Sequence, residues 1–171
     1  MNSLQNYHIH RAAEKDLPRL LELYARARTF MALKGNASQW GNSYPAPEQI
    51  EEDIARGNLF AVTLEDREKI VGVFYYAMEI EPTYDYIENG PGWPDNEPYG
   101  VIHRMAGSAG MHGLAQFCFD YCLKQCNRLR LDTHADNKPM LRAIEDFGFD
   151  YCGIIYVKDH SPRKAFALKR D

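Results

Sequence analysis

The pattern of hydrophobic and polar positions divides the chain into short segments with two different periods. Apolar and polar residues alternate where half-buried strands are expected, and a period near 3.6 residues marks amphipathic helices. The predicted strands are 7–11, 59–64, 69–80, 101–106, 128–133, 151–157 and 164–168, and the predicted helices are 16–31, 47–56, the stretch after a turn at 107–110 to about 125, and 137–147. This order predicts a mixed α/β sheet flanked by helices.

Capping and turn residues agree with these boundaries. Asp16 and Asn137 are suited to cap helix N-termini, and Gly57 and Gly148 follow the last helical positions. The polar residues 65–68 are expected to form a hairpin turn between two strands. The first helix is expected to bury one stripe of side chains, consisting of Leu17, Leu20, Leu21, Tyr24 and Met31.

Residues 81–98 do not fit either period. They hold several prolines and glycines among aromatic residues, and a loop of this length inside a compact domain is usually functional or mobile. The aromatic residues of this and the other irregular segment are Trp40, Tyr84, Tyr86, Trp93 and Tyr99. Two interpretations stay open for these rings: they line a pocket for a substrate, or they pack the loops onto the sheet.

Composition and charge limit the class of protein. The chain has 171 residues, of which 45% are hydrophobic and 26% charged, so residues 1–171 are predicted to form a single globular domain. A net charge of -4 gives no general attraction to nucleic acid or to anionic lipid. The sequence has neither a run of about 20 apolar residues nor a secretory start, so we expect a cytoplasmic protein without a membrane partner.

The cysteines point to packing rather than to a metal site. Cys118, Cys122 and Cys126 repeat every four residues on one predicted helix, and Cys152 is distant in sequence. This spacing suits neither a disulfide framework nor a zinc site. We therefore expect free cysteines in the core and no bound metal.

The candidate chemistry begins at a glycine-rich turn between a predicted strand and a predicted helix. A helix start offers free backbone N–H groups and the positive end of the helix dipole, so glycines there can hold a phosphate against bare backbone. The spacing of Gly107, Gly110 and Gly113 matches neither the dinucleotide fingerprint nor the P-loop. The turn alone is also compatible with a packing role.

The run from residue 101 to 149 resembles the GNAT superfamily of acetyl-CoA-dependent N-acetyltransferases. The family's loop, Arg or Gln followed by x-x-Gly-x-Gly/Ala, stands here as Gly110-Met111-His112-Gly113-Leu114-Ala115. Gly110 replaces the usual Arg or Gln, which removes a side chain but keeps the backbone amides. Downstream, Asn137, Ala143 and Phe147-Gly148-Phe149 resemble the second signature of the family.

The resemblance covers nearly all of the chain except residues 81–98, and it implies a GNAT-like sheet with a splayed strand pair that admits the cofactor. In the family, the pantetheine arm extends one strand by backbone hydrogen bonds, and the matching strand here is 102–106. Asn137 either contacts this arm or only caps its helix, and both roles are compatible. The implied acetyl-CoA contacts are Met105, Ala106, Gly110, Met111, His112, Gly113, Leu114, Ala115 and Asn137.

The catalytic groups are less well defined. In many GNAT enzymes a Tyr donates a proton to the leaving thiolate, and the matching position here is Ile144. The candidate substitutes are His134, just beyond a strand end and near Asn137, and His103 on the cofactor strand. His134 has the better placement of the two, because ligands in such sheets gather beyond strand ends. A structural role stays open for each histidine, and Glu79 is a weaker candidate.

The resemblance implies an N-acetyltransferase that moves an acetyl group from acetyl-CoA to a primary amine, on a small molecule or a peptide. One alternative is a catalytically silent acyl-CoA-binding regulatory module, which the absence of the usual Tyr favours. Another is a mononucleotide-binding α/β domain. A homodimer is left open as an assembly.

Overall fold

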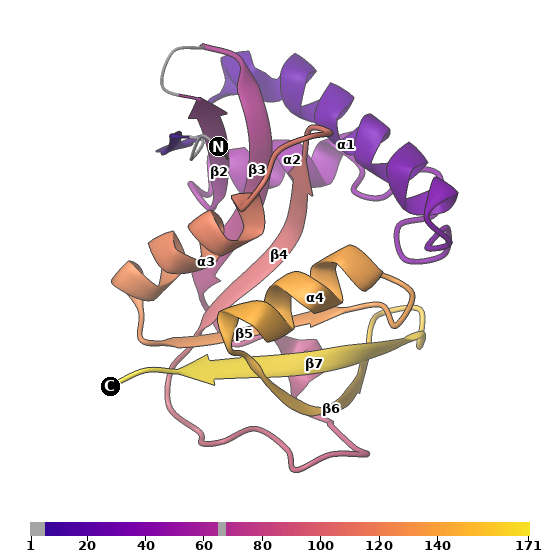
Figure 1. The fold of residues 1–171 in the computed structure, drawn as a ribbon, viewed down its shortest axis with the longest axis vertical. Helices are drawn as coiled ribbons and strands as arrows, with labels where there is room; N and C mark the ends of the chain where they lie inside the picture. The colour runs from indigo at the N-terminus through magenta and orange to yellow at the C-terminus, as the bar shows by residue number, and fades with distance from the viewer. Residues whose placement is uncertain (1–5, 65–67) are drawn as a thin grey trace.

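The structure, a computed structural model, describes residues 6–64 and 68–171 (Figure 1). The strands are β1 (Tyr7–Arg11), β2 (Leu59–Leu64), β3 (Ile70–Met78), β4 (Gly100–Gly107), β5 (Arg128–Thr133), β6 (Asp150–Tyr156) and β7 (Pro162–Lys169). The helices are α1 (Leu17–Leu33), α2 (Pro47–Ala55), α3 (Leu114–Gln125) and α4 (Lys138–Phe147), with short 3-10 helices η1 (Glu14–Asp16) and η2 (Pro82–Tyr84). The predicted mixed α/β architecture is confirmed.

The seven strands form one sheet in the order β1-β2-β3-β4-β5-β7-β6. Neighbouring strands are antiparallel except β4 and β5, which run parallel and pair only at Gly100 with Leu129 and at Val101 with Arg130. Beyond these pairs the two strands diverge, and within residues 6–64 and 68–171 no other strand pairs with the β5-facing edge of the remainder of β4. The predicted splayed strand pair is confirmed at this point.

A β-bulge distorts β4 where the splay begins. Val73 pairs with Ala106 and Tyr75 with His103, so two residues of β4, Arg104 and Met105, oppose the single residue between them on β3. Arg104 has a φ of 50°, a left-handed conformation that non-glycine residues seldom adopt. The bulge interrupts the β3–β4 register, and the carbonyl of Arg104 accepts from the Tyr24 hydroxyl of α1.

The two faces of the sheet are covered by different elements. Helices α3 and α4 pack on one face, in front of the sheet in Figure 1, against side chains such as Ile102, Leu129 and Leu131. Helices α1 and α2 cover the other face over β2 to β4, against Val73, Tyr75 and neighbouring residues. Because side chains alternate along a strand, consecutive residues of β4 serve different faces.

The segment between β3 and β4 lies over the second face of the other half of the sheet. Tyr84 is buried with residues of β4, β6 and β7. Glu88 forms an isolated antiparallel bridge with Ile154 of β6. Residues 81–98, expected as a loop, therefore contain a short helix and a strand-like contact, and they are packed against the domain.

Some details differ from the sequence-based expectation. β3 ends at Met78 rather than at Ile80, because the side chain of Ile80 is exposed and no partner strand continues there. Leu23 of α1 is fully buried although it was not part of the predicted stripe. Of the predicted hairpin turn 65–68, residues 65–67 lie outside the described residues. The β2 and β3 strands that it joins are antiparallel as predicted.

Core packing of the cysteines is confirmed for three of the four, and Cys126 is only partly buried. All four are free, and Cys118, Cys122 and Cys152 are buried. In the part of the chain that the structure describes, no group of three or more potential metal ligands comes together. The helices at 17–33, 47–55, 114–125 and 138–147 include none with the length and apolar character needed to cross a membrane.

Candidate functional site

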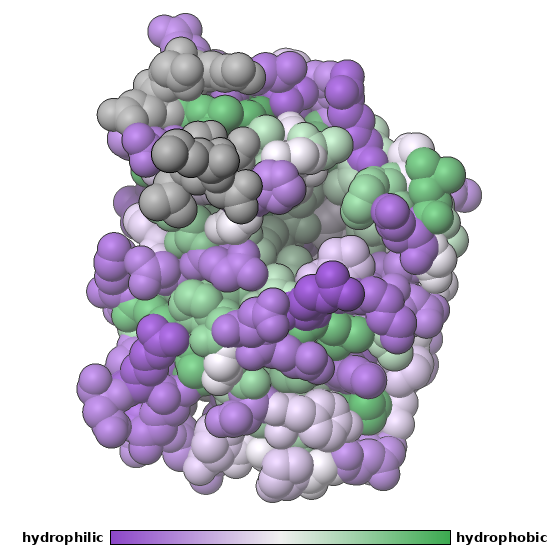
Figure 2. All heavy atoms as spheres, in the orientation of Figure 1, coloured by the Kyte–Doolittle hydropathy of each residue, from purple (hydrophilic) through white to green (hydrophobic). Residues whose placement is uncertain are grey.

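A cavity of about 610 Å³ opens where β4 and β5 diverge. It is bounded by the second half of α1, the loop after α1, the bulged part of β4, the glycine-rich loop, the end of β5 and the first turns of α4. Figure 2 shows the same face hollowed between the upper and lower halves of the molecule, with hydrophobic side chains at the floor. The predicted contacts that line the cavity are Met105, Ala106, Gly110, Met111, His112, Gly113, Leu114, Ala115 and Asn137.

The glycine-rich loop presents backbone to the cavity. Gly110 and Gly113 have φ angles of 80° and 70°, and no atom lies within 4 Å of the position that a Cβ would occupy at either residue. The first hydrogen bond of α3 runs from the N–H of Phe117 to the carbonyl of Gly113. The N–H groups of the first turn therefore have no partner inside the helix, and they carry the positive end of its dipole.

Three hydrogen bonds hold the loop from outside. The N–H of Ser108 donates to the carbonyl of Val71 at 2.8 Å, and Arg19 reaches Ser108 Oγ at 3.3 Å. The hydroxyl of Tyr7 donates to the carbonyl of His112 at 2.8 Å. The loop is thus fixed through Ser108 and through the carbonyl of His112, while its glycines line the cavity.

Asn137 caps α4 as the sequence predicts. Its side-chain oxygen accepts from the N–H of Met140 at 3.3 Å, and its Nδ2 donates to Gln39 Oε1 at 3.2 Å. Both interactions keep the amide at the cavity wall, so a capping role and a contact with a bound ligand are compatible.

The position of the usual family tyrosine points away from the cavity. Ile144 is fully buried in the core between α4 and the sheet and lies outside the cavity lining, whereas Met140 and Ala143 of the same helix form part of it. The general acid cannot come from this position without repacking the core.

Both ring nitrogens of His134 already have partners. Its Nδ1 accepts from the N–H of Asp136 at 3.0 Å, and its Nε2 lies 3.2 Å from Ser38 Oγ. The residue is also outside the cavity lining. The structure therefore does not bring His134 to the cavity, although the sequence favoured it over His103, and its catalytic role stays an untested prediction.

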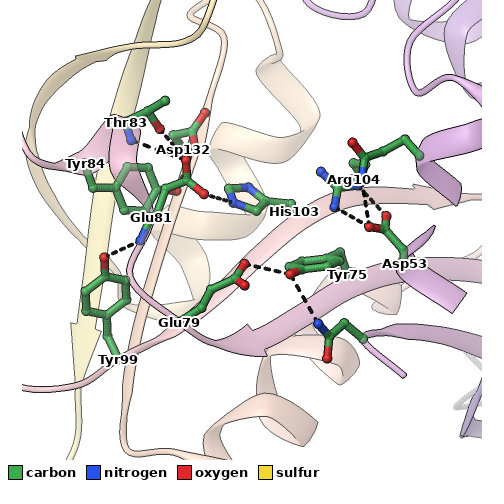
Figure 3. A network of polar contacts seen from close by, with 12 residues as sticks. Asp53, Tyr75, Glu79, Glu81, Thr83, Tyr84, Tyr99, His103, Arg104 and Asp132 are labelled. Carbon is green, nitrogen blue, oxygen red and sulfur yellow. Dashed lines mark hydrogen bonds and ion pairs between the residues drawn. The ribbon is translucent and has the colours of Figure 1, made fainter. Parts of the chain in front are cut away.

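His103 lines the cavity and meets a carboxylate. Its Nε2 lies 3.2 Å from Glu81 Oε2, and each of the two side chains is 19% exposed (Figure 3). The imidazole lies between two tyrosine rings, with centroid distances of 5.8 Å to Tyr75 and 6.2 Å to Tyr84. Burial raises the pKa of Glu81, but the hydrogen bond and charge of His103 and hydrogen bonds from Thr83 outweigh it and lower this pKa to about 2.

Two further carboxylates belong to the same face. Tyr84 donates to Asp132 Oδ2 at 2.7 Å, and Tyr75 donates to Glu79 Oε1 at 2.7 Å. Burial, reinforced by the neighbouring carboxylates, raises the pKa of both phenols, so the two tyrosines stay protonated donors. Asp132 also lines the cavity.

The nearby cation is already paired. Arg104, at the bulge, donates to both carboxylate oxygens of Asp53 at 2.8 and 3.0 Å, and its guanidinium lies 4.5 Å from the centroid of the Tyr75 ring. The carbonyl of Arg104 accepts from the Tyr24 hydroxyl at 2.8 Å. These contacts bind the left-handed residue to α1 and α2, and they hold the bulge in place.

Sequence analysis did not identify Glu81, Tyr84 and Asp132 as site residues. Tyr84 was noted there only as one of several loop aromatics. One signal was available: Glu79 and Glu81 follow β3 with the spacing that places two side chains on one face. The contact of Glu81 with His103 of β4 could not be derived, because it depends on how residues 81–98 return across the sheet.

The comparisons with known proteins agree with this arrangement. No family model matches the chain, and no curated protein matches it by sequence. The structure is similar to a GNAT-family acetyltransferase from Streptococcus agalactiae, with a TM-score of 0.87, 26% identity, and coverage of 99% of this chain and 98% of that chain. A protein from Staphylococcus aureus provisionally described as an acetyltransferase has a TM-score of 0.68 and 29% identity, covering 94% and 97%.

A third similar structure carries a ligand. It is a Salmonella typhimurium protein provisionally described as an acetyltransferase and solved with its cofactor acetyl-CoA, with a TM-score of 0.63, 12% identity, and coverage of 96% of this chain and 94% of that chain. The fold is a split-sheet α/β architecture of the kind found in the similar structures named as GNAT-family acetyltransferases. The resemblance to the GNAT superfamily is confirmed, and the chain shares this fold over nearly its whole length.

Proposed function

We propose that the protein is an N-acetyltransferase that moves an acetyl group from acetyl-CoA to a primary amine. The observation that carries the proposal is the cavity between β4 and β5, with an unpaired strand edge on one side and a helix start with bare glycines on the other. An unpaired edge suits the amides of a pantetheine arm, and the helix start suits a pyrophosphate.

The residues of this chain fit acetyl-CoA in two places. The loop from Gly110 to Ala115 offers amides to the pyrophosphate, and the open space at Gly113 leaves room for phosphate oxygens. Met105 and Ala106 lie on the part of β4 that pairs with β3 but not with β5, and Asn137 lines the same cavity. Bound acetyl-CoA supplies the activated acetyl thioester.

His103 is our candidate base for the acceptor amine. It lines the cavity on the face opposite α3 and α4, and Tyr84 links it to Asp132, so an amine can approach from that side. The acceptor is a small-molecule amine or a peptide amine. The four free cysteines support a cytoplasmic location as part of the same proposal.

Calorimetry with acetyl-CoA and with CoA, followed by a panel of amines with free-thiol detection, tests the proposal. We expect both ligands to bind competitively and at least one amine to release thiol. Absence of binding of either ligand at millimolar concentration would contradict the proposal. Binding without turnover across the panel would favour the silent acyl-CoA-binding module, which the buried Ile144 at the usual tyrosine position supports.

A further inference from the structure

We propose that Glu81 is a positioning residue that fixes the tautomer of His103, so that Nδ1 of His103 is the atom that accepts the proton of the acceptor amine. This inference rests on the proposed acetyltransferase function. It assigns a role to the segment between β3 and β4, which supplies Glu81 and which the resemblance to the family does not cover.

The first step is the state of the carboxylate. With a pKa lowered to about 2, Glu81 is ionised at neutral pH and can only accept hydrogen bonds. It accepts from the N–H and Oγ1 of Thr83 at 3.4 and 2.8 Å through Oε1, which leaves Oε2 for His103. The backbone N–H of Glu81 also donates to the Tyr99 hydroxyl at 3.0 Å. Glu81 is therefore held as a fixed acceptor.

The second step is the tautomer. A nitrogen 3.2 Å from an obligate acceptor carries the proton, so a neutral His103 has its hydrogen on Nε2 and its lone pair on Nδ1. Rings of Tyr75 and Tyr84 on either side restrict rotation of the imidazole. A histidine held in this way keeps the same nitrogen available in every turnover.

The third step is the set of charges around the imidazole. Glu81 follows β3 and contacts the ring directly, while Glu79 and Asp132 act through Tyr75 and Tyr84. Arg104, which follows His103 in β4, is paired with Asp53 of α2. Of the three carboxylates, Glu81 is therefore the one that contacts the imidazole directly and can orient it.

The reaction balances with these groups. The amine enters as an ammonium ion and gives one proton to His103 Nδ1. Its lone pair then forms a bond to the acetyl carbon as the carbon–sulfur bond breaks. The remaining excess proton on nitrogen neutralises the departing thiolate, and His103 later releases its proton to solvent. Glu81 stays ionised throughout and stabilises the imidazolium at Nε2–H.

The test is Glu81→Gln, with Glu88→Gln as the matched control. Glu88 lies in the same segment and also accepts from tyrosines, Tyr86 and Tyr156, but it does not contact His103. We expect kcat of Glu81→Gln to fall by roughly 10- to 100-fold, with the KM for acetyl-CoA within about twofold of the native value. Glu88→Gln is expected to retain native kcat.

Imidazole 15N NMR reports the tautomer of His103, which would not change in Glu81→Gln if Glu81 had only a structural role. In the native protein at high pH, His103 should show the proton on Nε2, and in Glu81→Gln the two tautomers should mix. A native Nδ1–H tautomer, or an unchanged kcat in Glu81→Gln, would overturn the inference.

If no amine is acetylated by the native protein, the proposed function fails, and the NMR result still tests the role of Glu81. Should Glu81→Gln not fold, Thr83→Val loosens the same carboxylate and should produce a smaller change in both readouts.

Discussion

At the scale of single residues, Gly113 gives the sharpest test of the proposed cofactor loop. Its φ of 70° and open surroundings mean that alanine would cost about 1–2 kcal/mol of backbone strain and would place a methyl group in the proposed phosphate space. In the native protein, acetyl-CoA at about 100 times its Kd should stabilise the fold by ~2.7 kcal/mol. Gly113→Ala should lose most of this stabilisation in a thermal scan.

Gly148 provides the control for the strain. It ends α4 with a φ of 106°, no atom lies within 4 Å of its Cβ position, and it lies outside the cavity lining. Gly148→Ala should lower Tm by a comparable amount yet keep the full acetyl-CoA shift. If Gly113→Ala also keeps the full shift, the phosphates bind elsewhere.

Thr133 is a second residue with an unusual environment. It is 1% exposed at the cavity end of β5, and within the described part of the chain its hydroxyl has no hydrogen-bond partner. A buried hydroxyl without a partner costs free energy, so Thr133→Val should stabilise the unliganded protein by about 1 kcal/mol in chemical denaturation. Thr133→Ser, which keeps the hydroxyl and loses a methyl group, should destabilise it. A less stable Thr133→Val would show that the hydroxyl is satisfied.

Glu81 predicts a pH dependence of stability. Its pKa in the folded protein, about 2, is below the ordinary value of 4.5, so the unfolded chain binds the proton more readily. The contribution is therefore complete above about pH 5 and is lost as the pH falls towards 2, and it amounts to roughly 2–3 kcal/mol. Denaturation of Glu81→Gln as a function of pH should give a flatter acid limb than in the native protein. Equal slopes would contradict the ion pair with His103.

At the scale of elements, α4 determines what the family tyrosine position can do. Ile144 is fully buried, so Ile144→Tyr would force a larger side chain into a packed core and cost about 1–3 kcal/mol. We expect no gain in turnover, because the new hydroxyl would not reach the cavity. Ile144→Val, as the size control, should cost about 0.5–1.5 kcal/mol. A stable Ile144→Tyr with faster thiol release would show that α4 can turn this position towards the cavity.

The elements were largely predictable because each depends on a local pattern. The strands follow from alternation, and α3 and α4 follow from their glycine and asparagine signals, which the structure places at Gly113 and Asn137. The bulge at Arg104 could not be predicted, since a register shift belongs to two strands at once and leaves no trace in one of them. For a similar reason, the sequence could not show which of His103 and His134 lies at the cavity. The position of each ring depends on a partner that is distant in the chain, Glu81 for His103 and Ser38 for His134.

At the scale of the whole molecule, the segment 79–99 joins the two halves of the split sheet. It leaves β3, contacts His103 of β4 through Glu81, and then crosses to β5 and β6. The guanidinium of Arg130 on β5 lies 4.4 Å from the Trp93 ring centroid and 4.0 Å from that of Tyr99. Sequence analysis left two roles open for the loop aromatics, pocket lining and packing. The structure shows a packing role for Trp93 and Tyr99. The proposal of one domain for residues 1–171 accords with this connection.

The arrangement of the two faces also has a consequence for the order of chemical events. The glycine loop lies on the face of α3 and α4, whereas His103 and Glu81 lie on the opposite face. Acetyl-CoA and the acceptor amine can therefore be bound at the same time. No cysteine lines the cavity, and burial raises the pKa of the Cys118 and Cys122 thiols and that of Cys152 to about 11. We therefore expect the acetyl group to pass directly from acetyl-CoA to the amine in a ternary complex, without an acetylated protein intermediate. Initial rates at several fixed acetyl-CoA concentrations should give intersecting double-reciprocal lines, and parallel lines would reveal an acetylated intermediate instead.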